Sequence, residues 1–126
     1  MEIWKIGVIS GYFLLADFVW ITQFATAQYQ ARLGDMLQMA DGWQLGLGLV
    51  AVYALLLLGL YGFVLVGDIS LVKAVGFGLV VYGVYGFTNY LILQQWSLDL
   101  VLVDFVWGGF LYGSSAAIAK LINYTQ

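Results

Sequence analysis

The stretch LVKAVGFGLVVYGVYGFTNYLIL (Leu71–Leu93) decides the class of fold, because Lys73 is its only charged residue. An α-helix rises about 1.5 Å per residue, so about 20 apolar residues cross the hydrocarbon core of a bilayer. Three other apolar runs have a similar length: Ile6–Ala27, Leu45–Val66 and Leu98–Leu121. Helices satisfy their own backbone hydrogen bonds in lipid. The sequence therefore predicts an all-α, integral membrane four-helix bundle.

The composition supports residence in a membrane. Of the 126 residues, 63% are hydrophobic and 9% are charged, whereas a soluble domain has about 25% charged residues. The length fits a single transmembrane domain over residues 1–126. The chain has no cysteine and no histidine, which removes thiol chemistry and the usual ligands of zinc and haem. We predict no cofactor and no metal, while a bound lipid is compatible with the sequence.

The breaks between the runs contain residues that typically cap helices. Ser70 and Ser97 each precede an apolar run, and Asp99 falls in the first turn of the last one. Asp41, with Gln44 three residues later, resembles a capping box. Serine and aspartate at these positions accept hydrogen bonds from the first free N–H groups of a helix. We therefore expect helices to begin at these sites.

The segment QYQARLGDMLQMAD (residues 28–41) differs from the four runs because it is amphipathic. Its apolar residues fall on one helical face, which is typical of a helix at a membrane surface. The pattern predicts a short interfacial helix, or a polar extension of the first helix. A solvated connector is the third interpretation.

The few positive charges predict an orientation. With four crossings, Lys5, Lys73 and Lys120 fall on one side of the membrane and Arg32 falls on the other. Cytoplasmic flanks carry the excess of lysine and arginine. We therefore predict a multi-pass protein with both termini on the cytoplasmic or equivalent side. Aromatic side chains near the helix ends fit the two membrane interfaces; they are Trp4, Tyr29, Trp43, Trp96 and Tyr124.

The tetrapeptide DFVW occurs twice, at residues 17–20 and 104–107, each time inside an apolar run. The antiparallel layout places Asp17 and Asp104 at similar depths in the outer half of the membrane. Each indole N–H then faces the carboxyl of the other helix. The third run adds polar groups at helical spacing. The predicted buried polar cluster consists of Asp17, Trp20, Tyr82, Tyr85, Asn89, Asp104 and Trp107.

Burial in hydrocarbon is costly for a charged carboxyl group, so we expect at least one of these aspartates to be neutral. Two interpretations of the cluster remain open. It is either polar glue between helices or the lining of a cavity for a proton, a small ligand or a lipid headgroup.

The 16 glycines predict close helix packing. Small residues four apart let helix backbones approach each other in a membrane. The predicted packing positions are Gly42, Gly46, Gly83, Gly86, Gly109 and Gly113. They serve the contacts within the bundle, or they dock a neighbouring protein.

The stretch VVYGVYGFTNYLILQQWSLDLVLVDFVWG (Val80–Gly108), together with LADFVW (Leu15–Trp20), resembles the family called domain of unknown function 2177. These are small predicted membrane proteins with Asp-x-x-Trp in the first and fourth helices. Gly86 stands where the family pattern usually has a third aspartate, so of these three acidic positions this chain keeps only Asp17 and Asp104. The resemblance implies a four-helix membrane fold and no particular activity.

From these features we favour a non-enzymatic accessory or scaffold subunit of a larger membrane assembly. The alternatives are a small transporter or proton-coupled carrier that uses the aspartate pair, and a membrane enzyme that acts on lipids. The predicted partners are membrane lipids and either other membrane protein subunits or further copies of the chain. The net charge of −3 and the lack of a basic cluster argue against nucleic acid.

Overall fold

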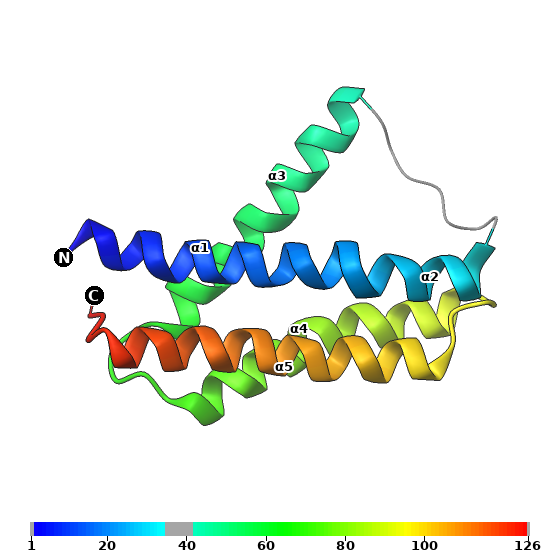
Figure 1. The fold of residues 1–126 in the computed structure, drawn as a ribbon. Helices are drawn as coiled ribbons and strands as arrows, with labels where there is room; N and C mark the ends of the chain where they lie inside the picture. The colour runs from blue at the N-terminus through cyan, green and yellow to red at the C-terminus, as the bar shows by residue number, and fades with distance from the viewer. Residues whose placement is uncertain (1, 35–41, 126) are drawn as a thin grey trace.

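The computed structural model describes residues 2–34 and 42–125, and these are almost entirely helical (Figure 1). The elements in chain order are α1 (Ile3–Trp20), the π-helical turn η1 (Ile21–Ala25), α2 (Thr26–Leu33), α3 (Gly42–Gly59), the π-helical turn η3 (Leu60–Val64), α4 (Leu71–Ile92) and α5 (Leu98–Leu121).

The described part of the chain has four helical stretches that are long and apolar enough to cross a membrane. They are Ile3–Ala31, Gly42–Val64, Leu71–Ile92 and Leu98–Leu121. The all-α, multi-pass prediction is confirmed. The last two stretches begin and end within one residue of the predicted runs, because Ser70 and Ser97 mark their starts.

The first helical stretch is longer than predicted. α1, η1 and α2 follow one another without a break and run as one rod in Figure 1. Residues 28–33 thus form the predicted extension of the first helix, and Leu33 and Tyr29 pack beside Trp96. Residues 35–41, which include the rest of the amphipathic segment and the Asp41 cap, lie outside the described residues.

The helices pack unevenly. α4 and α5 form an antiparallel hairpin with the most extensive contact in the described structure, and α1 packs against α5. α3 crosses the bundle at its C-terminal end and diverges from α1 toward its N-terminal end (Figure 1). The main buried core lies where α1, η3, α4 and α5 meet; it includes Ile9, Phe13, Leu60, Leu65, Leu111 and Tyr112.

Glycine backbones make the contact between α4 and α5. A Cβ atom added to Gly78 would lie 1.9 Å from the carbonyl oxygen of Gly108. The predicted packing glycines on these two helices also meet side chains of the other helix. A Cβ atom at Gly83, Gly86, Gly109 or Gly113 would lie within 3.4 Å of Phe105, Val101, Leu79 or Val75 respectively.

The packing interpretation does not hold for Gly42 and Gly46 within the described chain. A Cβ atom at either position would meet no other atom within 4 Å. The reason is the divergence of α3, which carries its N-terminal half away from α1 (Figure 1). Docking of another protein on these two glycines stays a prediction.

The serine residues before α4 and α5 act differently. Ser70 caps α4 as predicted, since its hydroxyl oxygen accepts a hydrogen bond of 3.2 Å from the Lys73 N–H. Ser97 occupies the N-cap position of α5, but its hydroxyl donates to the Asp99 carboxylate. Ser97 thus occupies the predicted N-cap position, but its side chain makes no capping hydrogen bond.

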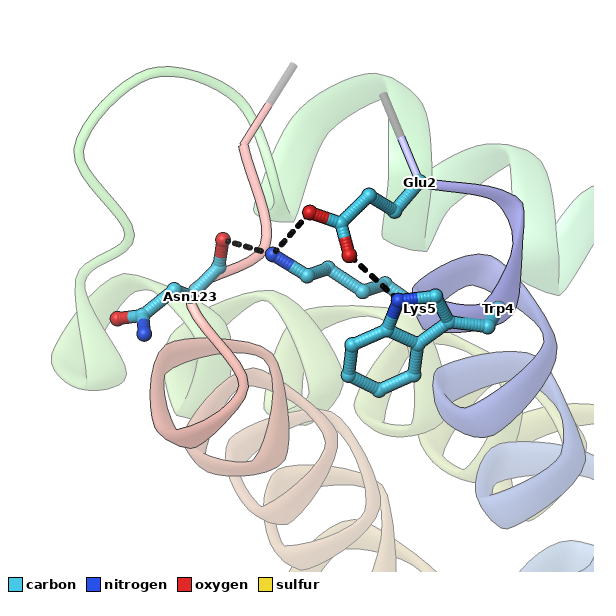
Figure 2. A network of polar contacts seen from close by, with 4 residues as sticks. All are labelled: Glu2, Trp4, Lys5 and Asn123. Carbon is cyan, nitrogen blue, oxygen red and sulfur yellow. Dashed lines mark hydrogen bonds and ion pairs between the residues drawn. The ribbon is translucent and has the colours of Figure 1, made fainter.

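The two ends of the chain lie together (Figure 2). The Lys5 ammonium donates to the Asn123 carbonyl oxygen at 3.0 Å and forms an ion pair with Glu2 at 3.7 Å. The Trp4 indole also donates to Glu2. These contacts join the start of α1 to the end of α5. Both termini are therefore at one end of the bundle, while the side of the membrane on which they lie stays a prediction.

Candidate functional site: two buried aspartates

Asp17 lies in α1 and faces the bundle. Its side chain is 3% exposed. Its Oδ1 atom accepts a hydrogen bond of 3.1 Å from the Trp107 indole of α5 and one of 3.3 Å from the Tyr82 hydroxyl of α4. Tyr53 of α3 interacts electrostatically with the same carboxyl group. Side chains from all four helical stretches therefore meet at Asp17.

Asp104 lies in α5 and is 4% exposed. Its Oδ2 atom accepts a hydrogen bond from the Tyr29 hydroxyl of α2. The Trp20 indole lies near this carboxyl group, and Asp17 is close enough to interact with it electrostatically. The two carboxyl groups consequently belong to one site.

The two tryptophans of the repeated tetrapeptide join the aspartates. Trp20 and Trp107 stack with their ring centroids 4.6 Å apart and their planes 3° from parallel. Because α1 and α5 run in opposite directions, the Trp107 indole reaches Asp17 and Trp20 faces Asp104. Of the two expected indole–carboxyl hydrogen bonds, the one from Trp107 to Asp17 is present, whereas Trp20 makes no described hydrogen bond to Asp104.

Tyr85 and Asn89 lie at the margin of the cluster. The Tyr85 side chain is 53% exposed and is within hydrogen-bonding reach of Asn89 on the same helix. Its ring stands edge-on to Trp96, with centroids 5.9 Å apart. Neither side chain makes a described hydrogen bond to an aspartate, although Tyr85 interacts electrostatically with Asp104. The expected direct bonds are absent from the described contacts because this end of α4 turns its tyrosine outward.

Tyr29, for which the sequence predicts only a place near a membrane interface, is a direct partner of Asp104. A continuous α-helix turns by about 100° per residue, which would leave Tyr29 about 120° away from the Asp17 face. The wider π-helical turn at Ile21–Ala25 takes up about one residue of rotation. Tyr29 and Asp17 therefore project from nearly the same face.

Two further aromatic residues were missed as members of the site or its surroundings. Tyr53 comes from α3, and no sequence pattern indicates which face of this almost entirely apolar helix turns toward Asp17. Trp96, between α4 and α5, is buried against other side chains, and its indole N–H has no hydrogen-bond partner among the described residues. It packs against Tyr29 with centroids 5.3 Å apart.

The chemistry of this site is that of two acids among neutral donors. Tyrosine and tryptophan donors stabilise a carboxylate by hydrogen bonding, but they leave its charge in the hydrocarbon uncompensated. The basic residues lie near the ends of the helical stretches; they are Lys5, Arg32, Lys73 and Lys120. No group of three metal-ligating side chains occurs in residues 2–34 and 42–125. A proton is the simplest partner that restores neutrality.

Comparisons with known proteins identify the family alone. No curated protein and no solved structure matches the chain. The model of a family described as predicted membrane protein (DUF2177) matches residues 4–121 of the 126. The match contains both aspartates, both stacked tryptophans and every helix that surrounds them. The chain therefore belongs to the DUF2177 family of predicted membrane proteins.

Proposed function

We propose that the protein is a small proton-linked membrane carrier in which Asp17 and Asp104 bind and release the coupling proton. The observation that supports this proposal is the meeting of two buried carboxyl groups, from α1 and α5, in one cluster of neutral donors. Intramembrane acids of this kind mark ion and proton pathways.

The physical basis is a change of charge. When both carboxyl groups are neutral, the cluster holds no net charge, so its burial in the hydrocarbon avoids the cost of a buried charge. Loss of one proton creates an anion that the Tyr82, Trp107 and Tyr29 donors stabilise through hydrogen bonds. The cluster thus supports two protonation states within one packed structure, which is what proton coupling requires.

The test is infrared titration of the purified protein, in which protonated carboxyl groups have their own C=O band. Exposed carboxyl groups are ionised above the acidic range, so we expect a part of the band that persists above that range in the wild type, diminishes in Asp17→Asn or Asp104→Asn, and vanishes in the double variant. Asp68→Asn, at an exposed position between η3 and α4, is the matched control and should leave this part of the band unchanged. A band that persists above the acidic range in the double variant would remove the basis of the proposal.

A second candidate function, the accessory subunit, is supported by a different feature. The N-terminal half of α3 exposes apolar side chains, and its three glycines have open space around them; these are Gly42, Gly46 and Gly48. Such a surface fits the helix of another membrane protein, because small residues permit close backbone approach.

Native mass spectrometry of the protein, extracted gently from its own membrane, tests this second candidate. A complex with unlike subunits that dissociates in Gly46→Leu is the expected result. Gly76→Leu, on the α4 surface where a Cβ atom also meets nothing within 4 Å, is the control. A monomer or a complex of identical copies would contradict an accessory role.

A further inference from the structure

Tyr29 reaches Asp104 through an unusual stretch of helix. α1, η1 and α2 form one rod (Figure 1), and the π-helical turn η1 holds one residue more than a regular α-helix would. Without this turn Tyr29 would lie about 120° from the Asp17 face, and Leu33, one helical turn further along, would rotate away with it. Because π-helical turns are rare within α-helices, contacts made by α2 must hold this one in place.

Trp96, between α4 and α5, supplies such contacts. Its ring packs against the Tyr29 ring with centroids 5.3 Å apart, and Trp96 forms a small buried cluster with Leu33 and Val101. The Tyr85 ring of α4 stands edge-on to Trp96 at 5.9 Å. Tyr29 and Leu33 are four residues apart and therefore lie on one face of α2. A single side chain thus contacts the face of α2 that has to point toward α5.

The indole N–H of Trp96 indicates which kind of contact matters. The side chain is 6% exposed, and this N–H has no hydrogen-bond partner among the described residues. A buried donor without a partner costs free energy, so hydrogen bonding does not account for a tryptophan at this position. The size of the ring does, because an aromatic side chain buries a large area against its neighbours. Trp96 therefore acts through the shape of its ring.

We propose that Trp96 is a positioning residue of the acid site, which holds η1 in its π-helical register and so keeps the Tyr29 hydroxyl on Asp104. The contacts run from the Trp96 ring to the Tyr29 ring, and from the Tyr29 hydroxyl to the Asp104 carboxyl group. The inference deepens the proposed function, and its bearing on proton release rests on that function, because Tyr29 is one of the donors that stabilise the deprotonated pair.

The test observes the Tyr29 hydrogen bond by nuclear magnetic resonance of the purified full chain, labelled with ¹³C at the hydroxyl-bearing ring carbon of tyrosine. The Tyr29 signal is the one that is lost in Tyr29→Phe, and Asp104→Leu gives its position without the acceptor. We expect Trp96→Ala to move the Tyr29 signal most of the way to the Asp104→Leu position. Trp96→Phe keeps an aromatic ring and removes only the unpartnered N–H, so it should leave the signal close to its wild-type position.

Trp43→Ala is the matched control. Trp43 lies at the start of α3 and is 72% exposed, so the same substitution there should leave the Tyr29 signal unchanged. Trp96→Leu, which retains more apolar bulk, takes the place of Trp96→Ala if the latter lowers the helical circular dichroism, and the same movement is expected. An unmoved Tyr29 signal in a helical Trp96→Ala or Trp96→Leu protein would overturn the proposal.

Deletion of Gln23 separates the register of the helix from packing alone. Gln23 is an exposed residue within η1, and its removal lets α1 and α2 join as a regular α-helix. The loss of one residue takes away about 100° of rotation, which leaves Tyr29 within about 20° of the Asp17 face. We therefore expect the wild-type Tyr29 signal in the deletion variant, whether or not Trp96→Ala is added. A signal that Trp96→Ala moves equally with and without the deletion would show that Trp96 does not act through the register of η1.

Failure of this inference and failure of the proposed function are distinguishable. If no part of the infrared carboxyl band persists above the acidic range in the wild type, the proposed function fails, while the Tyr29 signal still decides whether Trp96 positions Tyr29. If the band persists but the Tyr29 signal does not respond to Trp96→Ala, this inference is wrong and the proton site stands. A Tyr29 signal that does not respond to Asp104→Leu would likewise overturn the inference, because the hydrogen bond to be positioned would be absent.

Discussion

Gly78→Ala is expected to unfold or loosen the bundle, with a loss of about 3 kcal/mol in the free energy of unfolding. The added methyl carbon would lie 1.9 Å from the Gly108 carbonyl oxygen and 2.5 Å from the carbonyl carbon. These are backbone atoms of α5, so no side-chain rotation can relieve the clash. The helices of the most extensively packed pair would have to move apart.

Gly76→Ala is the matched control for this experiment. It adds the same methyl group to the same helix two residues away, where nothing lies within 4 Å. Unfolding in a series of mild to denaturing detergent mixtures, followed by circular dichroism, measures both variants. Gly76→Ala should stay within about 0.5 kcal/mol of the wild type, as surface substitutions usually do. A Gly78→Ala protein as stable as Gly76→Ala would show that α4 and α5 do not meet at this point.

Tyr112→Ala is the second large effect, with an expected loss of about 3–5 kcal/mol in the free energy of unfolding. Tyr112 is the largest fully buried side chain of the described core. Its ring packs edge-on against Phe13 of α1 and Phe77 of α4, with centroids 5.1 and 5.0 Å apart. Its hydroxyl donates to the Leu56 carbonyl oxygen of α3 at 2.8 Å. Truncation therefore opens a cavity where all the spans meet.

Tyr112→Phe separates the packing of the ring from the hydrogen bond of the hydroxyl. It keeps the aromatic contacts and removes the bond to Leu56, which we expect to cost about 1 kcal/mol. The same detergent unfolding series measures this variant. Two equal losses for Tyr112→Ala and Tyr112→Phe would contradict the packing argument, since the ring would then contribute nothing.

The membrane spans were predictable because hydropathy and turn residues act locally. Lys73 is the only charge in the third run, and Ser70 caps that helix as its position indicates. The contact between Asp17 and Trp107 could also be predicted from the sequence, because helix direction and a rise of about 1.5 Å per residue place the two residues at similar depth. These inferences need no knowledge of which helices touch most closely.

The remaining features depend on packing between segments. The π-helical turn at Ile21–Ala25 has no proline or other obvious marker, yet it decides that Tyr29 reaches Asp104. The divergence of α3 could not be predicted either. This helix has no distinct polar face, so the sequence does not indicate which of its faces packs against the bundle. The open surroundings of Gly46 follow from that divergence.

The adjacency of the termini at Lys5 and Asn123 has a consequence for gene duplication. An even number of crossings returns the chain to the side from which it started. Two copies fused head to tail through a short linker would insert in the same orientation. Their repeats would be related by an axis along the membrane normal, as parallel repeats are. An inverted pair of this fold would instead need an additional crossing in the linker, or two chains inserted separately.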